Sequence, residues 1–208
     1  MQHGLFITLE GSEGAGKSTQ IDVIKTYLEK RQRKVECVRE PGGTEIAEEI
    51  RTILKKSRTQ EQMQDITEML LMYAAREQLV HNFIKPSLNK GIDVICDRHD
   101  LSSIAYQGGG RGIPMEYLEA MRRMVLGSFH PNVTFLLDLD VNVGMQRVEN
   151  RGGRDRFELA KMDFFLRVRE TYLEFARKDP EHIIVIDASQ PISKVSLDIT
   201  SHLDKLLG

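Results

Sequence analysis

Short apolar runs alternate with stretches of helical spacing along the chain. The runs have the length of β-strands and hardly alternate with polar residues, which is typical of strands buried on both faces of a sheet. They lie at residues 5–9, 34–39, 92–96, 133–139 and 182–186. Strands that alternate with helices in this way predict an α/β fold with a five-stranded parallel sheet and helices on both faces.

Between these runs, apolar residues three and four positions apart predict helices. We expect helices at residues 20–31, 45–56, 63–88, 114–126, 141–151, 157–178 and 192–207. Thr44 is expected to cap the second helix, and Pro86 marks either the last turn of the third helix or a kink in it. The four glycines within residues 108–112 predict a loop.

Length and composition are those of an ordinary globular protein. The chain has 208 residues, which predicts a single domain over residues 1–208. A formal net charge of −2 gives no general attraction to nucleic acid or to an anionic membrane surface. No apolar run has membrane-spanning length, and a strand begins too early for a signal peptide, so we expect a cytoplasmic protein. Cys37 and Cys96 lie in apolar runs and are expected to be reduced core residues.

The first apolar run leads into a phosphate-binding pattern. Residues 11–18 fit G-x-x-x-x-G-K-[ST] and stand between a predicted strand and a predicted helix, where a P-loop is expected. Its glycines allow the backbone N–H groups to surround phosphates, Lys17 would neutralise the β- and γ-phosphates of ATP, and Ser18 would bind Mg²⁺. The predicted ATP-binding segment is Gly11, Ser12, Glu13, Gly14, Ala15, Gly16, Lys17, Ser18 and Thr19.

Arginines gather at predicted strand ends and in loops, where ligands bind in parallel sheets. Arginine binds phosphate with two parallel hydrogen bonds, so a second phosphate site opposite the P-loop would suit an acceptor nucleotide. Arg98 is the strongest candidate because it follows the third strand directly, next to Asp97, which is placed to face Mg²⁺ or its water shell. The arginines in question are Arg39, Arg51, Arg76, Arg98, Arg111, Arg147, Arg151, Arg154 and Arg156.

Several further motifs resemble those of bacterial thymidylate kinases, in that family's order and over nearly the whole chain. The pairing of D-R-H with A-Y-Q-G is specific to that family, whereas the P-loop is shared with many NTPases. The matching segments are Leu-Glu-Gly at 9–11, R-E-P-G-G-T at 39–44, Y-A-A-R at 73–76, D-R-H at 97–99, S-S-I-A-Y-Q-G at 102–108 and D-A-S-Q at 187–190.

The resemblance implies transfer of the γ-phosphoryl group of ATP to thymidine 5′-monophosphate (dTMP) in a P-loop nucleoside monophosphate kinase. It implies that Arg51 and Arg98 hold the acceptor phosphate and that Tyr106 lies against the sugar. An aromatic ring usually stacks on thymine, and the candidates here are Tyr73 and Met72. The implied dTMP-binding residues are Arg51, Tyr73, Arg76, Arg98, Ser103, Tyr106 and Gln107, with Arg76 at the thymine carbonyl and Ser103 and Gln107 along the rest of the base edge.

The donor side is implied in the same way. Arg147 and Gln190 join the P-loop in binding ATP, with the 187–190 loop beside adenine. Mg²⁺ would be held by Ser18 and Asp97. Because Gly14 puts no basic side chain in the P-loop, the resemblance implies an Arg-rich lid at about 147–157, hinged at glycines. The implied catalytic residues are Lys17, Glu13, Arg98, Arg151 and Arg156.

This chemistry needs no dedicated base, since a phosphate oxygen is already largely anionic near neutral pH. Catalysis then rests on aligning two polyanions and neutralising the charge of the moving group. We therefore expect His99 to be structural rather than a general base. Excluding water is the other requirement, because ATP would otherwise be hydrolysed.

Two alternatives remain at this point. One is a sister nucleoside monophosphate kinase with another base, although Arg76, Ser103 and Gln107 favour a pyrimidine carbonyl edge. The other is a P-loop switch or regulatory ATPase, which needs no second phosphate site. The resemblance also implies a homodimer that joins through apolar faces of helices within 45–56, 63–88 and 97–126.

Overall fold

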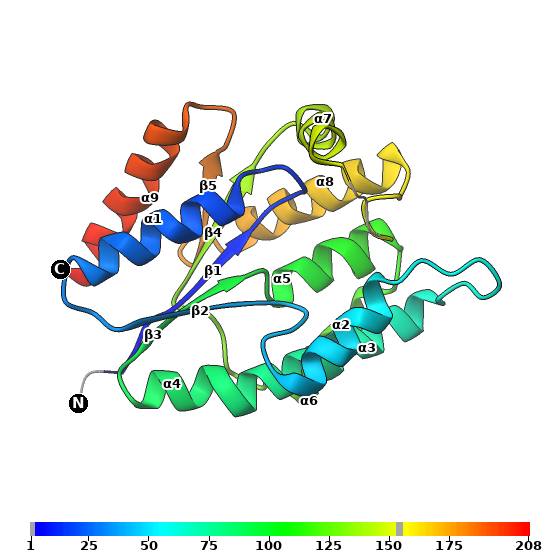
Figure 1. Cartoon of the computed structure of the whole chain (residues 1–208), viewed down its shortest axis with the longest axis horizontal. Helices are drawn as coiled ribbons and strands as arrows, with labels where there is room; N and C mark the ends of the chain where they lie inside the picture. Colours follow the sequence, from blue (N-terminus) through cyan, green and yellow to red (C-terminus); the bar gives the residue numbers. More distant parts are fainter. Residues whose placement is uncertain (1–2, 153–155) are drawn as a thin grey trace.

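The computed structural model describes residues 3–152 and 156–208, which form one sheet covered by helices (Figure 1). All strand pairs are parallel, in the order β2-β3-β1-β4-β5. The predicted α/β fold with five parallel strands is confirmed. The strands are β1 (Phe6–Glu10), β2 (Val35–Arg39), β3 (Asp93–Asp97), β4 (Val133–Asp138) and β5 (Ile183–Asp187).

Most predicted helices are present, with shifts at their ends. The last long helix before β5 begins at Met162 rather than at 157, because residues 156–159 form turns. The helical elements are α1 (Lys17–Glu29), α2 (Glu45–Lys55), α3 (Asp65–Leu79), η1 (Val80–Ile84), α4 (Lys85–Asn89), α5 (Asp100–Ser103), η2 (Ile104–Gly110), α6 (Met115–Val125), α7 (Val141–Arg151), α8 (Met162–Lys178) and α9 (Ile192–Leu207).

The middle strand β1 shows why the sheet is buried on both faces. Alternate side chains of a strand point to opposite faces. Ile7 and Leu9 therefore pack against α1 and α9, whereas Phe6 packs against α3, α4 and α6. In Figure 1, α1 and α9 lie together over one face and α3, α4 and α6 run along the other. All five residues of β1 are buried, which fixes the strand that carries the P-loop at the centre of the molecule.

The helix predicted over 63–88 is interrupted. Its middle forms the π-helical turn η1, and Pro86 follows in the first turn of α4. Proline has no N–H to continue α-helical bonding, so the widened turn before it absorbs the break. Thr44 does occupy the N-cap of α2, but its buried hydroxyl makes no hydrogen bond within the described residues. Gly43 N–H instead donates to the Glu48 carboxylate at 2.7 Å.

The glycines predicted to form a loop at 108–112 instead continue a helix. Gly108, Gly109 and Gly110 belong to the π-helical segment η2, which packs on α8. A Cβ atom on Gly109 would lie 2.0 Å from the Thr171 Oγ1, and one on Gly110 would lie 2.3 Å from the Phe164 ring. These glycines therefore permit close helix contact rather than chain flexibility.

The two cysteines differ in their environment. Cys96 on β3 is buried, but Cys37 lies exposed on the edge strand β2, so the prediction that it is a core residue is wrong. The apolar run around Cys37 did not reveal that β2 is an edge strand, which pairs with β3 alone. Among residues 3–152 and 156–208, none of the helices combines the length and apolar composition needed to cross a membrane.

Candidate active site

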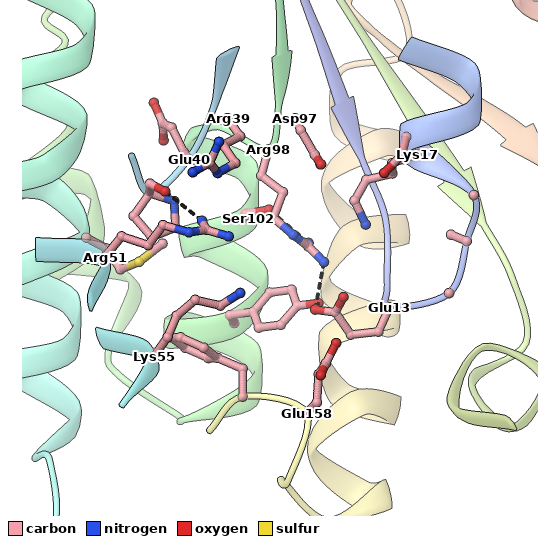
Figure 2. A pocket seen from close by; sticks show the side chains of 18 of the residues that line it. Glu13, Lys17, Arg39, Glu40, Arg51, Lys55, Asp97, Arg98, Ser102 and Glu158 are labelled. Carbon is pink, nitrogen blue, oxygen red and sulfur yellow. Dashed lines mark hydrogen bonds and ion pairs between the residues drawn. The ribbon is translucent and has the colours of Figure 1, made fainter. Parts of the chain in front are cut away.

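A pocket of about 430 Å³ opens at the carboxyl ends of the central strands (Figure 2). In Figure 2, Lys17 enters from one side and Arg51 and Lys55 enter from the opposite side, with Arg98 between them. The P-loop, the ends of β2 and β3, α2, η2 and the segment before α8 thus meet at one cavity. It is lined by Glu13, Gly14, Ala15, Gly16, Lys17, Ser18, Thr19, Arg39, Glu40, Pro41, Arg51, Lys55, Met72, Asp97, Arg98, Ser102, Tyr106, Gln107, Phe157 and Glu158.

The P-loop joins β1 to α1, as the motif predicts. Gly14 and Gly16 adopt positive φ values of 72° and 90°, which glycine reaches without strain. A Cβ atom on Gly14 would also lie 2.4 Å from the Gly144 carbonyl oxygen on α7, so this position has no room for a side chain. Helix α1 begins at Lys17, and its N-terminus therefore faces the pocket with free N–H groups that suit an anion.

Lys17 lies folded against its own loop. Its Nζ donates to the carbonyl oxygens of Gly11 and Ser12, each at 3.1 Å, and the side chain is buried. Burial lowers the pKa of Lys17, and the nearby Arg98 guanidinium lowers it further. Glu13, Asp97 and Glu10 act in the opposite direction and raise this pKa, and the negative charge of a bound polyanion would raise it further.

Arg98 connects the end of β3 to the P-loop. Its guanidinium donates to the Gly11 carbonyl at 2.9 Å, to Glu13 at 2.8 Å and to the Tyr172 hydroxyl at 3.2 Å. The backbone adopts φ 69°, a left-handed conformation that is uncommon outside glycine, asparagine and aspartate. The ring of Tyr106 lies 4.9 Å from the same guanidinium. Arg98 is thus held in one position by its surroundings before any ligand binds.

Glu13 is the partner of Arg98 inside the P-loop. Burial raises the pKa of Glu13, but Arg98 and Lys17 outweigh burial and lower that pKa to about 2. The Tyr106 hydroxyl also donates to the Glu13 carboxylate at 3.0 Å. The pocket therefore holds an ionised carboxylate whose position is fixed between the P-loop and η2.

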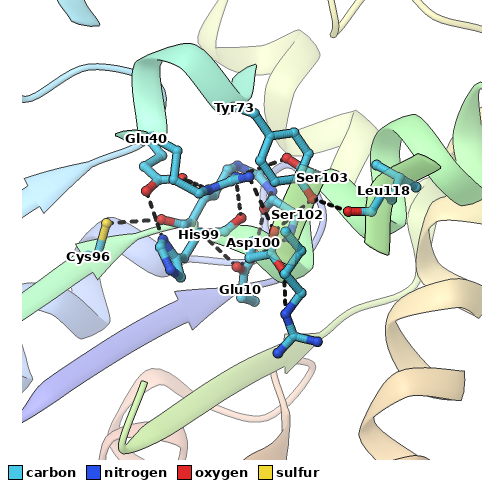
Figure 3. Close-up of polar contacts among 12 residues, drawn as sticks. Glu10, Glu40, Tyr73, Cys96, His99, Asp100, Ser102, Ser103 and Leu118 are labelled. Carbon is cyan, nitrogen blue, oxygen red and sulfur yellow. Dashed lines mark hydrogen bonds and ion pairs between the residues drawn. The ribbon is translucent and has the colours of Figure 1, made fainter. Parts of the chain in front are cut away.

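Arg76 is fully buried behind the pocket wall rather than lining the pocket. Its guanidinium donates to Glu40 at 2.8 Å, to Asp100 at 3.3 Å and to the Ser103 hydroxyl at 2.9 Å. Figure 3 shows this cluster of carboxylates and hydroxyls at the start of α5. Arg76 and Ser103, which were expected to touch the base directly, bond to each other and do not line the pocket, so their contact with a base stays a prediction.

The structure also separates the two candidates for contact with thymine. Tyr73 is fully buried, and its hydroxyl donates to Asp100 at 2.8 Å, so it lies in the cluster of Figure 3 and not in the pocket. Met72 lines the pocket. Neighbouring residues of an α-helix point about 100° apart, so one of the two had to face away. Of the two candidates, Met72 is the one that faces the pocket, and its contact with thymine stays a prediction.

His99 lies in the same cluster. Its Nδ1 is 2.7 Å from the Glu40 carboxylate, its backbone N–H donates to Glu10, and the residue is buried. It does not line the pocket. This placement agrees with a structural role for His99.

Comparison with known proteins identifies the family. Residues 9–199 match the family model described as Thymidylate kinase. The chain belongs to the thymidylate kinase family. It is 49% identical over 204 residues to the thymidylate kinase of Idiomarina loihiensis, an alignment that covers 98% of each chain. It is 47% identical to that of Vibrio parahaemolyticus, over 100% of this chain and 99% of the relative.

A solved structure has the same fold. The crystal structure of thymidylate kinase from Ehrlichia chaffeensis superposes with a TM-score of 0.78 at 32% identity, covering 97% of this chain and 99% of that one. A match over nearly the whole of both chains includes the sheet as well as the helices around it. The motifs that suggested the resemblance therefore belong to one shared architecture.

The structure places the lid arginines of this thymidylate kinase family member unevenly. Arg147 donates to the Gly14 carbonyl at 3.0 Å, beside the P-loop. Arg156 donates to the Leu54 carbonyl at 2.8 Å and to Glu68 at 2.6 Å, and it does not line the pocket, contrary to its expected position at the transferred group. The side chain of Arg151, and Arg154 as a whole, lie outside the described residues. An Arg-rich lid therefore stays a prediction.

Lys55 and Glu158 are among the polar pocket residues that had not been predicted. Lys55 lies one helical turn after Arg51 on α2, so the i, i+4 spacing of two cations was the signal that would have found it. Glu158 is buried and lines the pocket next to Phe157, and no sequence pattern marks it. In contrast, Gln190 lies in an exposed turn, where its amide donates to the Asp187 carbonyl at 3.2 Å, so its contact with adenine stays a prediction.

Asp97 and Ser18 both line the pocket. The Asp97 Oδ1 is buried and accepts no hydrogen bond from the described residues. An orphaned carboxylate oxygen beside a phosphate-binding loop fits a hard cation or its bound water. No group of three or more His, Cys, Asp or Glu side chains in the described part of the chain could hold a metal alone, so a Mg²⁺ ion here would need phosphate oxygens as well.

The low pKa of Glu13 predicts a pH-dependent contribution to stability. The pKa of this carboxyl group is 4.5 in the unfolded chain and about 2 in the folded protein. Its ionised form therefore stabilises the fold by roughly 3 kcal/mol above pH 4.5, and this stabilisation is lost as the pH falls toward 2. The Glu13→Gln variant should therefore differ most from wild type near pH 6, and the difference should shrink below about pH 4. Denaturant unfolding across this range measures it. The exposed Glu61→Gln is the control, and parallel curves for Glu13→Gln and wild type would contradict the pKa assignment.

Proposed function

We propose that this chain transfers the γ-phosphoryl group of ATP to dTMP and so makes thymidine 5′-diphosphate. The observation that carries the proposal is one pocket with a P-loop on one side and Arg51, Lys55 and Arg98 on the other. A switch ATPase needs no second cationic site, so this arrangement favours a kinase with a phosphorylated acceptor. Membership of the thymidylate kinase family names the acceptor.

On the donor side, the P-loop amides and Lys17 bind the β- and γ-phosphates. Lys17 leaves the carbonyls of Gly11 and Ser12 when the phosphates arrive, because a phosphate oxygen is a stronger partner for an ammonium group than a carbonyl. Arg147, already beside Gly14, extends the cationic wall around ATP. These groups neutralise charge on the transferred group, which is the main catalytic requirement of phosphoryl transfer.

On the acceptor side, Arg98 and Arg51 hold the phosphate of dTMP. Arg51 donates to the Pro41 carbonyl at 2.7 Å, which keeps its guanidinium at the pocket edge. Tyr106, fixed by its bond to Glu13, packs against the sugar. Gln107 reads the base edge, because its buried Oε1 lacks a hydrogen-bond partner among the described residues and the residue lines the pocket. Met72 covers the base, with Arg76 and Ser103 supporting the wall behind it.

The acceptor oxygen is the nucleophile and is already anionic, so no side chain has to remove a proton. The role of the protein is to hold both phosphates in line and dry. Arg151 remains the proposed lid cation at the transferred group. Arg156 is engaged by Glu68 and Leu54 and is assigned instead to anchoring the segment after α7.

Ser18 and Asp97 are the proposed Mg²⁺ residues. Held by the Ser18 hydroxyl and the Asp97 carboxylate, the ion would neutralise part of the charge of the donor phosphates. Asp97→Asn removes the orphaned carboxylate charge but keeps the size of the side chain. We expect it to raise the Mg²⁺ concentration for half-maximal rate roughly tenfold or more. Titration of activity with Mg²⁺ measures this, and an unchanged midpoint would remove Asp97 from the site.

A coupled assay of ADP release tests the function. ADP should form rapidly with dTMP present and slowly without it. Equal release with and without dTMP would favour a switch ATPase. Faster turnover of another nucleoside monophosphate would favour a sister kinase. The cytoplasmic location is part of the same proposal, and cell fractionation tests it.

Two substitutions should separate the donor and acceptor sites. Lys17→Ala should abolish turnover in a folded protein, whereas Arg51→Ala should raise the KM for dTMP and leave the KM for ATP nearly unchanged. Loss of a charge-assisted contact costs about 1.5–3 kcal/mol, which corresponds to roughly ten- to a hundredfold in KM. Arg31→Ala, on the surface and paired with Asp204, is the matched control. Equal effects of Arg51→Ala on both KM values would reject the acceptor assignment.

The homodimer is proposed from exposed apolar side chains on adjoining helices. Six of the exposed large apolar side chains lie on α2, α3 and α6, and α3 packs against both of the other helices. This surface agrees with the helices expected to form the interface. Its members are Ile46 and Ile53 of α2, Ile66 and Leu70 of α3, and Tyr117 and Met124 of α6.

Sedimentation equilibrium tests the dimer. We expect wild type to be dimeric at micromolar concentration and Leu70→Glu to be monomeric, since a charge buried in an interface without a partner opposes association. Leu197→Glu, equally exposed but on α9 across the sheet, should remain dimeric. A monomeric wild-type protein, or dissociation by both variants alike, would contradict the proposed face.

A further inference from the structure

A buried carboxylate on α3 takes part in none of the contacts assigned above to substrates. Glu68 is fully buried, and its two oxygens accept hydrogen bonds from three side chains. Oε1 accepts from Gln107 Nε2 at 2.7 Å and from Arg111 Nε at 3.2 Å. Oε2 accepts from Arg111 at 3.0 Å and from Arg156 at 2.6 Å. Glu68 therefore links the pocket residue Gln107 to two arginines that lie outside the pocket.

These contacts determine which way the Gln107 amide points. Burial raises the pKa of Glu68, but Arg111, Gln107 and Arg156 together lower it, so the group is ionised and only accepts hydrogen bonds. Gln107 must then direct its NH₂ group toward Glu68. Its oxygen is left buried and without a partner in the described part of the chain, on a residue that lines the pocket.

An acceptor at this position distinguishes pyrimidines. Thymine and uracil carry a donor N3–H between two carbonyl groups, whereas cytosine presents a lone pair at N3. An oxygen that faces N3 accepts a hydrogen bond from thymine or uracil, but it is repelled by the lone pair of cytosine. Leaving a buried polar group unpaired costs more than losing a neutral contact, so such a site discriminates strongly.

We propose that Glu68 is a positioning residue that sets the base preference of this enzyme by fixing the orientation of the Gln107 amide. The inference rests on the proposed thymidylate kinase function and deepens it. Glu68 does not touch the substrate; it acts through Gln107. The two arginines contribute by holding the carboxylate in place and ionised.

The Glu68→Gln variant has a specific consequence. Its amide has one acceptor oxygen, and the position of Oε2 is where both Arg111 and Arg156 donate. Two guanidinium N–H groups donate at that position, at 3.0 and 2.6 Å, against the single longer contact of Arg111 Nε at the Oε1 position, at 3.2 Å. The oxygen should therefore settle at the Oε2 position, which turns the new NH₂ group toward Gln107. Gln107 would then rotate by half a turn to accept that hydrogen bond and would present its own NH₂ group to the pocket. A donor at this position suits the N3 lone pair of cytosine.

The experiment measures kcat/KM for dTMP, deoxyuridine monophosphate and deoxycytidine monophosphate. We expect Glu68→Gln to lower the ratio of the thymidine to the cytidine substrate at least about tenfold, while the ratio of thymidine to uridine stays within about twofold. Thymine and uracil share the N3–H edge, so the second ratio is an internal control. A purely structural loss would lower all three rates without this pattern.

Asp65→Asn is the matched control. Asp65 lies 3.6 Å from Arg111, one turn before Glu68 on α3. The substitution makes the same carboxylate-to-amide change at a residue that does not bond to Gln107, whose partner is Glu68. It should keep the wild-type ratios. Glu68→Asp serves if Glu68→Gln does not fold: it retains the charge for both arginines but withdraws from Gln107, so the thymidine-to-cytidine ratio should again fall.

Three outcomes would overturn the inference. A folded Glu68→Gln or Glu68→Asp enzyme with the wild-type thymidine-to-cytidine ratio would show that Glu68 does not fix the orientation of the Gln107 amide. An equal fall of the thymidine-to-cytidine and thymidine-to-uridine ratios would show that Glu68 does not act through the N3 edge, which thymine and uracil share. If the wild-type chain fails to phosphorylate dTMP at all, the proposed function fails and takes the inference with it, which distinguishes that failure from the first two.

Discussion

The ion pair between Arg98 and Glu13 is the interaction on which the rest of the site depends. The two residues follow different strands, β3 and β1, and their 2.8 Å contact fixes the end of one strand against the loop of the other. Arg98 also donates to the Gly11 carbonyl and adopts a left-handed backbone conformation. Such a conformation costs roughly 1–2 kcal/mol and persists because the surrounding contacts require it. Removing one partner of a buried ion pair lowers the free energy of unfolding by about 3–5 kcal/mol.

The sequence was sufficient for the strands and for the P-loop because both depend on local patterns. An apolar run buried on both faces and a glycine-rich turn before a helix can be recognised without knowing the neighbours. The glycines of η2 could not be interpreted this way, since what requires them is the approach of Thr171 and Phe164 from α8. Exposure of Cys37 likewise depends on strand order, which no local pattern contains.

The site was predictable only in part, for a related reason. Motif residues such as Arg98, directly after β3, and Lys17, at the start of α1, had to reach the pocket because the backbone takes them there. On α3, the rotation of the helix about its axis determines which side chains face the pocket. Met72 lines the pocket, whereas Tyr73 is buried in the core. Glu68 gave no signal, because a single acidic residue on a predicted helix is most often solvated. Its burial follows from three partners that come from distant parts of the chain.

Buried carboxylates divide the arginines into two sets. Arg76 forms ion pairs with Glu40 and Asp100, and Glu68 forms ion pairs with Arg111 and Arg156. These three arginines do not line the pocket. Arg39, Arg51 and Arg98 line the pocket, where the proposed function places the phosphates. A count of arginines in the sequence therefore overstates the number of phosphate ligands. The division also has a catalytic consequence. Within the pocket set, Arg98 is already held by Glu13 and the Gly11 carbonyl. In the proposed reaction it therefore needs little reorganisation when charge develops in the transition state, and preorganised electrostatic stabilisation of this kind usually lowers the barrier more than any other single effect.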